Sequence, residues 1–213
     1  MSVESLYPFL YDGAGDAEGL REQAVRSTAA KADEIVALRK QVLARSGDDL
    51  ERCATAMATA FASGARLFAF GNGGSSTDAQ ALVRLFTRPH GGRALPAVSL
   101  SADVAVVTAL ANDAGFENVF ARQVAAFRRA GDIAVGVSTS GGSENVARAF
   151  DAARRLGALT VGFAGYDGGT MAGAGTVDHL FVVPSDSVHR IQEAQTTLYH
   201  VLWTLTQEAL ASS

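Results

Sequence analysis

The stretch that decides the fold is residues 68–86, FAFGNGGSSTDAQALVRLF. It opens with an apolar run, breaks into glycines and hydroxyl-bearing residues at positions 71–77, and resumes apolar residues at helical spacing. An apolar run of this kind, followed by a glycine-rich turn and an amphipathic segment, is typical of a strand buried in a parallel sheet and the helix after it. The stretch therefore predicts a strand–loop–helix unit whose loop has room for a ligand.

The same alternation recurs along the chain. Short apolar runs that do not alternate with polar residues stand at positions 67–70, 97–100, 133–137, 159–163 and 180–183. The segments between them, 74–88, 103–112, 116–130 and 143–156, have the length and spacing of helices. We predict an α/β fold: a doubly wound, five-stranded parallel sheet flanked by helices and joined by right-handed crossovers.

Long helices are predicted at both ends of the chain. Apolar residues recur at helical spacing over 17–46, and Asp48 with Asp49 would cap a second helix running to Gly64; a last helix covers 187 to about 210. We expect one domain over residues 1–213, with 1–64 as a helical extension that packs on the sheet or on a neighbouring subunit. The apolar residues at both ends exceed what one sheet needs, which predicts an oligomer; extra packing within one chain is the alternative.

Composition narrows the class of protein. The chain has 213 residues and a formal net charge of −4, so it offers no basic surface for direct nucleic-acid binding. Its single cysteine, Cys53, excludes a disulfide framework and fits a small apolar core residue. Neither a membrane-spanning run nor the pattern of a signal peptide is present in the sequence, so we expect no membrane partner and a cytoplasmic location.

A second hydroxyl-rich loop, STSGGS at 138–143, follows the third apolar run as GNGGSST follows the first. Parallel sheets bind ligands at the carboxyl ends of their strands, and glycines there let backbone N–H groups approach an anion. Serine and threonine add donors without charge. The two loops together predict a phosphate cradle, although each alone could be a tight turn with a helix cap.

Two nucleotide-binding motifs fail on inspection. The dinucleotide pattern starting at Gly71 has Ser76 in place of its last glycine, and no acid ends the second apolar run. A Walker loop needs a lysine that neither loop supplies. The predicted ligand is therefore a phosphorylated small molecule.

Several motifs carry a family resemblance. The segments GNGGSSTDAQ at 71–80, TALANDAGFENVFARQV at 108–124, GDIAVGVSTSGGSENV at 131–146, GYDGGTMA at 165–172 and RIQEAQTTLYH at 190–200 resemble the sugar isomerase (SIS) domain family, closest to its phosphoheptose isomerase branch. The resemblance implies a homotetramer with active sites shared between subunits, acting on sedoheptulose 7-phosphate. It also implies that the sugar is lined by Asn72 and Asp113 and that the phosphate is held by Ser75, Ser138, Thr139, Ser140 and Ser143.

The resemblance is incomplete where catalysis is expected. In catalytic relatives the helix after the first loop carries a histidine and, four residues later, a glutamate; here these positions are Ala81 and Leu85. The family's partners on the last helix are kept as Gln192 and His200. Neither Ala81 nor Leu85 can bind a metal or carry a proton, so the usual zinc site cannot form, and zinc remains conceivable only in a rebuilt site that uses Gln192 and His200. No cofactor is certain.

Other side chains could replace the missing base. Asp78 lies one turn before Ala81, Glu193 follows Gln192, and His189 stands in the first turn of the last helix. At a helix N-terminus His189 could act as a neutral base, or it could be a plain surface histidine. We expect His200 to serve as acid and base, the alternative being a hydrogen-bonded core or interface histidine.

Two functions follow from these residues. One is a sugar-phosphate isomerase, converting a ketose phosphate to an aldose phosphate at an altered metal and base site. The other is a non-catalytic sugar-phosphate-binding adaptor, resembling the family's paralogue that binds the bacterial replication initiator. The intact loops with Gln192 and His200 favour the first, and the apolar Ala81 and Leu85 favour the second.

Overall fold

The computed structural model describes residues 17–127 and 129–212 of the chain. The chain divides into two units, residues 1–37 and residues 38–213. In the first unit the described residues form the beginning of helix α2 (Ala17–Ala62), where Arg26 and Glu22 pair one turn apart on the exposed surface. None of the helices among the described residues is long and apolar enough to cross a membrane.

A five-stranded sheet with the order β2-β1-β3-β4-β5 forms the centre of the second unit, and every pairing in it is parallel. Its strands are β1 (Leu67–Gly71), β2 (Ala97–Ser99), β3 (Ile133–Ser138), β4 (Leu159–Gly165) and β5 (His179–Val183). All five predicted strands are thus confirmed within one or two residues. The apolar runs do not alternate with polar residues because the strands are buried on both faces: β1 and β3 are buried along their whole length.

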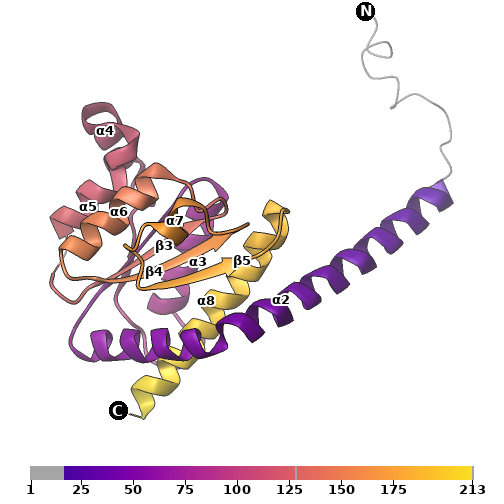
Figure 1. Ribbon diagram of the computed structural model, residues 1–213, viewed down its shortest axis with the longest axis horizontal. Coiled ribbons are helices and arrows are strands. Elements are labelled where there is room, and N and C mark those ends of the chain that lie inside the picture. The colour runs from indigo at the N-terminus through magenta and orange to yellow at the C-terminus, as the bar shows by residue number, and fades with distance from the viewer. Residues whose placement is uncertain (1–16, 128, 213) are drawn as a thin grey trace, which may run out of the picture. The chain divides into compact units, whose positions relative to one another are not determined.

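Helices join and cover these strands. They are α3 (Gly74–Thr87), α4 (Val104–Ala114), the short 3-10 helix η2 (Phe116–Asn118), α5 (Val119–Phe127), α6 (Glu144–Arg155), α7 (Gly169–Gly173) and α8 (Val188–Ala211). Figure 1 shows α8 in yellow, running past the strands. The predicted long C-terminal helix is confirmed. The short α7 was not predicted, since five residues containing two glycines give no helical period.

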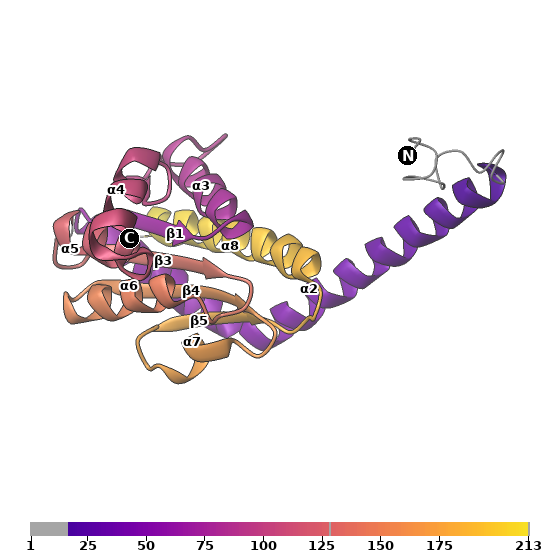
Figure 2. The same ribbon diagram turned by 90° about the horizontal axis from the view of Figure 1, so that it is seen from above.

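Each face of the sheet has its own aromatic core. On one face the Phe70 ring packs against Phe120 of α5 and Phe150 of α6, with centroids 5.6 Å and 5.4 Å away. On the other face α3 and α8 pack together, as Figure 2 shows, and Phe61 of α2 meets Phe86 of α3 at 5.9 Å. Helices on both faces make the sheet doubly wound, as predicted.

The predicted break in the N-terminal helix at Ser46 and Gly47 is wrong, because α2 runs unbroken from Ala17 to Ala62. A glycine inside a helix costs only about 1 kcal/mol relative to alanine. Val42 and Leu50, on either side of Gly47, are each 1% exposed, so buried packing continues through this point. Asp49 does not cap a helix and instead bonds His179 on β5, with Oδ1 2.9 Å from Nδ1.

The strand order fixes where a ligand can bind. From β1 the chain crosses to β2 on one side and then returns to β3 on the other side. The carboxyl ends of β1 and β3 therefore flank the topological switch point, which is where open parallel sheets form a binding crevice. The loops that leave these two strands are the two hydroxyl-rich loops of the sequence.

Candidate functional site at the switch point of the sheet

The two hydroxyl-rich loops meet through a pair of amide side chains. Asn72, just after β1, donates from Nδ2 to Oδ1 of Asn145 at 2.8 Å, and Asn145 donates back from Nδ2 to Oδ1 of Asn72 at 2.9 Å. Asn145 lies in the first turn of α6 and is 3% exposed. The pair spans the switch point and confirms that the loops after β1 and β3 converge.

The first loop turns sharply into α3. Gly73 has φ +53°, which favours glycine, and a Cβ at Gly71 would lie 2.7 Å from the backbone oxygens of Ser75 and Val137. The Ser75 side chain is buried beside this turn, 5% exposed. This close packing places the N-terminus of α3 at the switch point of the sheet, with the positive end of its helix dipole.

The second loop is stabilised by a hydrogen bond within the loop and by contacts with the end of β4 and the turn after it. Ser138 and Ser143 place their hydroxyl oxygens 3.0 Å apart, and Ser143 stands at the N-cap of α6 without using its hydroxyl to cap the helix. Gly141, at φ +63°, packs so closely on Gly168 that a Cβ would lie 2.0 Å from the Gly168 oxygen. Thr139 accepts a hydrogen bond from the Gly165 N–H at 2.9 Å.

The predicted phosphate residues therefore share one edge of the sheet. Ser75 and Ser138 are buried, Thr139 and Ser143 are half-buried, and Ser140 is exposed with its hydroxyl accepting from the Gly142 N–H at 3.2 Å. Hydroxyls and two helix N-termini at one edge of the sheet make a donor-rich site that suits a phosphate.

Gln192 reaches from α8 to the start of α3. A Cβ built on Gly74 would lie 2.2 Å from Nε2 of Gln192, so the amide occupies the space above this glycine. One turn further along α3, Asp78 accepts a side-chain hydrogen bond from Gln192. Asp78 is half-buried, and its Oδ2 is enclosed without a hydrogen-bond partner.

Burial raises the pKa of Asp78 above its ordinary value, and the hydrogen bond from Gln192 lowers it in part. Burial also raises the pKa of Tyr199 on α8; a hydrogen bond to Thr196 opposes this, and the charge of Asp78 adds to the rise. Asp78 of α3 and Gln192 of α8 thus interact across the interface of the two helices, and Tyr199 lies near enough for the charge of Asp78 to raise its pKa. The sequence singled out Gln192 and named Asp78 only as a substitute, and it gave no signal for Tyr199.

Three other predicted residues are exposed within one chain. His200 is exposed, its ring stacked on Tyr199 with centroids 5.2 Å apart, and it follows Gln192 by eight residues, or about 12 Å of helix. His189 is exposed in the first turn of α8. Asp113, exposed on α4, accepts a hydrogen bond from neighbouring Asn112 at 2.8 Å. Their roles at the site remain predictions.

The residues present do not fit the family's zinc ion. Ala81 and Leu85 are half-buried on α3 and offer no ligand atom. Over residues 17–127 and 129–212 no group of three or more histidine, cysteine, aspartate or glutamate side chains could hold a metal. Zinc needs about four nitrogen, sulfur or oxygen ligands around one point. The family's usual zinc site is therefore absent from the described residues.

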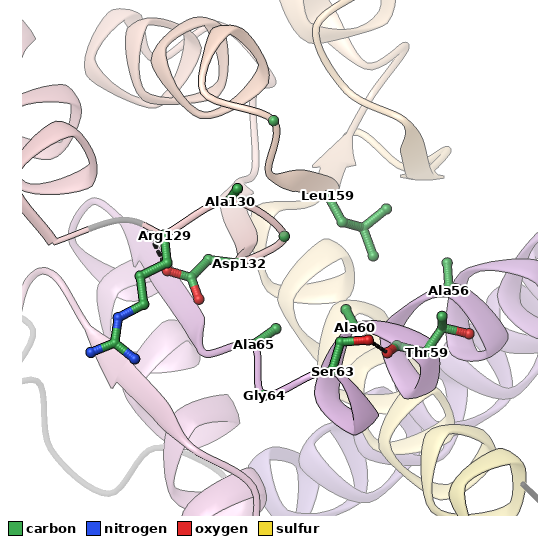
Figure 3. Close-up of a pocket in the computed structure, with 12 residues that line it drawn as sticks. Ala56, Thr59, Ala60, Ser63, Gly64, Ala65, Arg129, Ala130, Asp132 and Leu159 are labelled. Atoms are coloured by element: carbon green, nitrogen blue, oxygen red, sulfur yellow. Dashed lines mark hydrogen bonds between the residues drawn. The ribbon is translucent and has the colours of Figure 1, made fainter.

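A separate cavity of about 430 Å³ lies at the opposite edge of the sheet (Figure 3). Asp132, which precedes β3, accepts three hydrogen bonds there: from the Arg66 N–H at 2.8 Å, from Arg66 Nη2 at 2.9 Å and from the Arg129 N–H at 2.7 Å. Alanines and glycines form much of the remaining wall. The cavity lies about one strand length, roughly 16 Å, from the switch point.

Comparison with known proteins identifies the family of the chain. A family model described as the SIS domain matches residues 32–165. The phosphoheptose isomerase of Aquifex aeolicus (strain VF5) is 46% identical over 156 residues, 71% of this chain and 80% of that protein. The phosphoheptose isomerase of Desulfovibrio desulfuricans (strain ATCC 27774) is 42% identical over 194 residues, 88% of this chain and 89% of that protein.

Solved structures show the same likeness. The phosphoheptose isomerase structure from Neisseria gonorrhoeae superposes with a TM-score of 0.79 at 33% identity, covering 89% of this chain and 100% of that one. The structure from Francisella tularensis gives a TM-score of 0.81 at 27% identity, covering 87% and 98%. The chain belongs to the SIS domain family, in the branch of the phosphoheptose isomerases. The resemblance inferred from the sequence motifs is thereby confirmed.

Proposed function

We propose that the protein isomerises a ketose phosphate resembling sedoheptulose 7-phosphate to the corresponding aldose phosphate. The observation that carries the proposal is the meeting of two hydroxyl-rich loops at the switch point, joined by Asn72 and Asn145. The relatives at 42–46% identity bear the name of an enzyme with such a substrate, and the expectation of an isomerase agrees with them.

The phosphate would bind between the two loops. Its oxygens can accept from the hydroxyls of Ser75, Ser138 and Ser143 and from backbone N–H groups at the starts of α3 and α6. Thr139 and Ser140 complete the second loop. No positive side chain is needed, because the two helix N-termini already favour an anion.

The reaction moves a proton between neighbouring carbons. A base removes a proton from C1 of the ketose to give an enediol and returns one to C2, while the O1 hydroxyl loses its proton and O2 gains one. The Asp78 carboxylate is the group best placed to act as that base. It shares its face of α3 with Ala81 and Leu85, and a carboxyl whose pKa is raised by burial accepts a proton more readily near neutrality.

Gln192 would orient the substrate and stabilise the charge that develops on O2. Its amide already lies against Gly74 and Asp78, at the entrance of the crevice. A preorganised donor aimed at a developing oxyanion is worth about a hundredfold or more in rate.

His200 and His189 point outward from α8 and are exposed in one chain. They would reach substrate only across an interface between subunits, as would Asp113. We therefore include in the proposal a homotetramer with shared active sites, in which His200 protonates and deprotonates the substrate oxygens. Sedimentation analysis tests the assembly, and a monomer at micromolar concentration would contradict it.

The proposal is tested by incubating the protein with sedoheptulose 7-phosphate in deuterium oxide. We expect deuterium at the carbon next to the carbonyl, and a fall of about a hundredfold or more in D78N. Binding of the sugar phosphate without deuterium incorporation would contradict the isomerase function and support the non-catalytic binding function. Absence of binding would contradict both the isomerase function and the binding function for this sugar.

A further inference from the structure

Asn145 is the buried half of the amide pair that joins the two loops. It stands 73 residues from Asn72 in sequence, is 3% exposed, and makes two side-chain hydrogen bonds to Asn72, at 2.8 and 2.9 Å. Ser143, two residues earlier, bonds Ser138 across the same loop. A shift of Asn145 would therefore move both hydroxyl-rich loops.

The pairing also ties the orientation of the Asn72 amide to that of the Asn145 amide. A primary amide has two N–H donors and an oxygen with two lone pairs. The reciprocal bonds use one donor and one lone pair of Asn72, and turning its amide over would set nitrogen against nitrogen and oxygen against oxygen. Asn72 is left with one N–H and one lone pair, whose direction follows the orientation of the Asn145 amide.

We propose that Asn145 is a positioning residue of the sugar-phosphate site. Acting through Asn72, it sets the separation of the loops after β1 and β3 and the direction of the N–H that Asn72 offers to the ligand. The identity of the ligand, a sugar phosphate, rests on the proposed function. The positioning of the loops does not, because it can be measured in the free protein.

Two substitutions in the full chain separate this role from plain core packing. N145L keeps the number and branching of the side-chain heavy atoms and removes both hydrogen bonds. N145D keeps the acceptor for Asn72 Nδ2 and replaces the donor by a carboxyl group, which can donate to Asn72 Oδ1 only when protonated. Burial raises the pKa of such a carboxyl, so its donor returns as the pH falls.

Gln123 provides the matched control. It is another buried amide, 5% exposed, and its Nε2 donates to the carbonyl oxygens of Leu100 at 2.9 Å and Val119 at 3.0 Å, neither of which belongs to the two loops. Q123L therefore removes a buried amide from the same domain without removing the Asn72–Asn145 pair or the Ser138–Ser143 bond. Any effect common to Q123L and N145L reports stability alone.

The first measurement is amide hydrogen exchange of the free protein over residues 72–76 and 138–143. We expect faster exchange in both segments in N145L and unchanged exchange in Q123L. Unchanged exchange in both segments of N145L would overturn the proposal, whether or not the protein binds sugar phosphates. If N145L does not fold, N145D at pH 8 takes its place.

The second measurement is calorimetric binding of sedoheptulose 7-phosphate at pH 5 and pH 8, each variant expressed as a ratio to the unsubstituted protein at the same pH. We expect N145L to bind about tenfold more weakly at both pH values. N145D should match N145L at pH 8 and approach the unsubstituted protein at pH 5. A ratio for N145D that does not change with pH would overturn the positioning of Asn72. Failure of the unsubstituted protein to bind would instead count against the proposed function, and hydrogen exchange would still decide the role of Asn145.

Discussion

Gly74 and Gln192 are in direct contact across the α3–α8 interface: a Cβ on Gly74 would lie 2.2 Å from Nε2 of Gln192. The glycine therefore does more than start a helix. Its missing side chain is the space in which the Gln192 amide lies, within reach of Asp78.

Substitution G74A should displace the Gln192 amide while leaving the backbone in place, because the atom in the way is the flexible end of a side chain. We expect the free energy of unfolding to change by only about 1 kcal/mol. Deuterium incorporation from sedoheptulose 7-phosphate should fall by about tenfold or more. Undiminished deuterium incorporation in G74A would show that Gln192 does not take part in the catalytic step.

Substitution G47A should stabilise the protein. Gly47 lies inside the continuous helix α2, and a Cβ there would meet nothing within 4 Å. Alanine in a helix interior gains about 0.5–1 kcal/mol over glycine, partly by restricting the unfolded chain. Urea denaturation measures the gain, and a loss of stability would show that the helix is broken at this residue.

The D78N substitution should change how stability depends on pH. Because the pKa of Asp78 is raised in the folded state, its contribution to stability is fully present below its ordinary pKa and is lost as the pH rises through the folded value. The unsubstituted protein should lose stability over this window, and D78N should not. Parallel unfolding profiles from pH 3 upward would mean that Asp78 ionises as freely in the folded chain as in the unfolded one.

Cys53 should be inert to thiol reagents in the folded protein. Its side chain is fully buried in α2, and burial, reinforced by the charges of Asp49 and Asp178, raises the pKa of the thiol. Since the thiolate is the reactive form, labelling at pH 8 should be negligible until denaturant is added, and then reach one thiol per chain. Rapid labelling of the native protein would place Cys53 on an accessible surface.

Changes at Asp132 should affect stability without affecting the site. Its carboxylate is 2% exposed and pairs with Arg66 at 2.9 Å, at the opposite edge of the sheet. D132A leaves the Arg66 guanidinium without its partner and should cost about 3 kcal/mol or more, whereas D132N keeps part of the bonding and should cost less. Sugar-phosphate affinity, measured well below the unfolding temperature, should be unchanged in both variants.

Much of the fold followed from local sequence. Strands buried on both faces give unalternating apolar runs, so all five were found within one or two residues of their ends. The long helix α2 was wrongly divided because a serine and a glycine look like a terminus when read alone. Burial of Val42 and Leu50 on both sides outweighs the small cost of a glycine, and that burial is not visible in the local pattern.

The candidate site was predictable in its residue types and incomplete in its connections. Glycines and hydroxyls after β1 and β3 identified the two loops, since such residues after buried strands suit an anion. The bond between Asn72 and Asn145 could not be foreseen, because the two asparagines stand 73 residues apart and an asparagine near a helix start is common.

The sequence by itself determined the parallel α/β fold, the two donor-rich loops and the absence of a ligand atom at Ala81 and Leu85. Each of these depends on residue type and short-range spacing. Only the tertiary structure decided that the loops meet at the switch point, that Gln192 fills the space above Gly74 beside Asp78, and that His200 faces outward. These relationships depend on strand order and on which faces of α3 and α8 pack together, and such long-range packing leaves no period in the sequence.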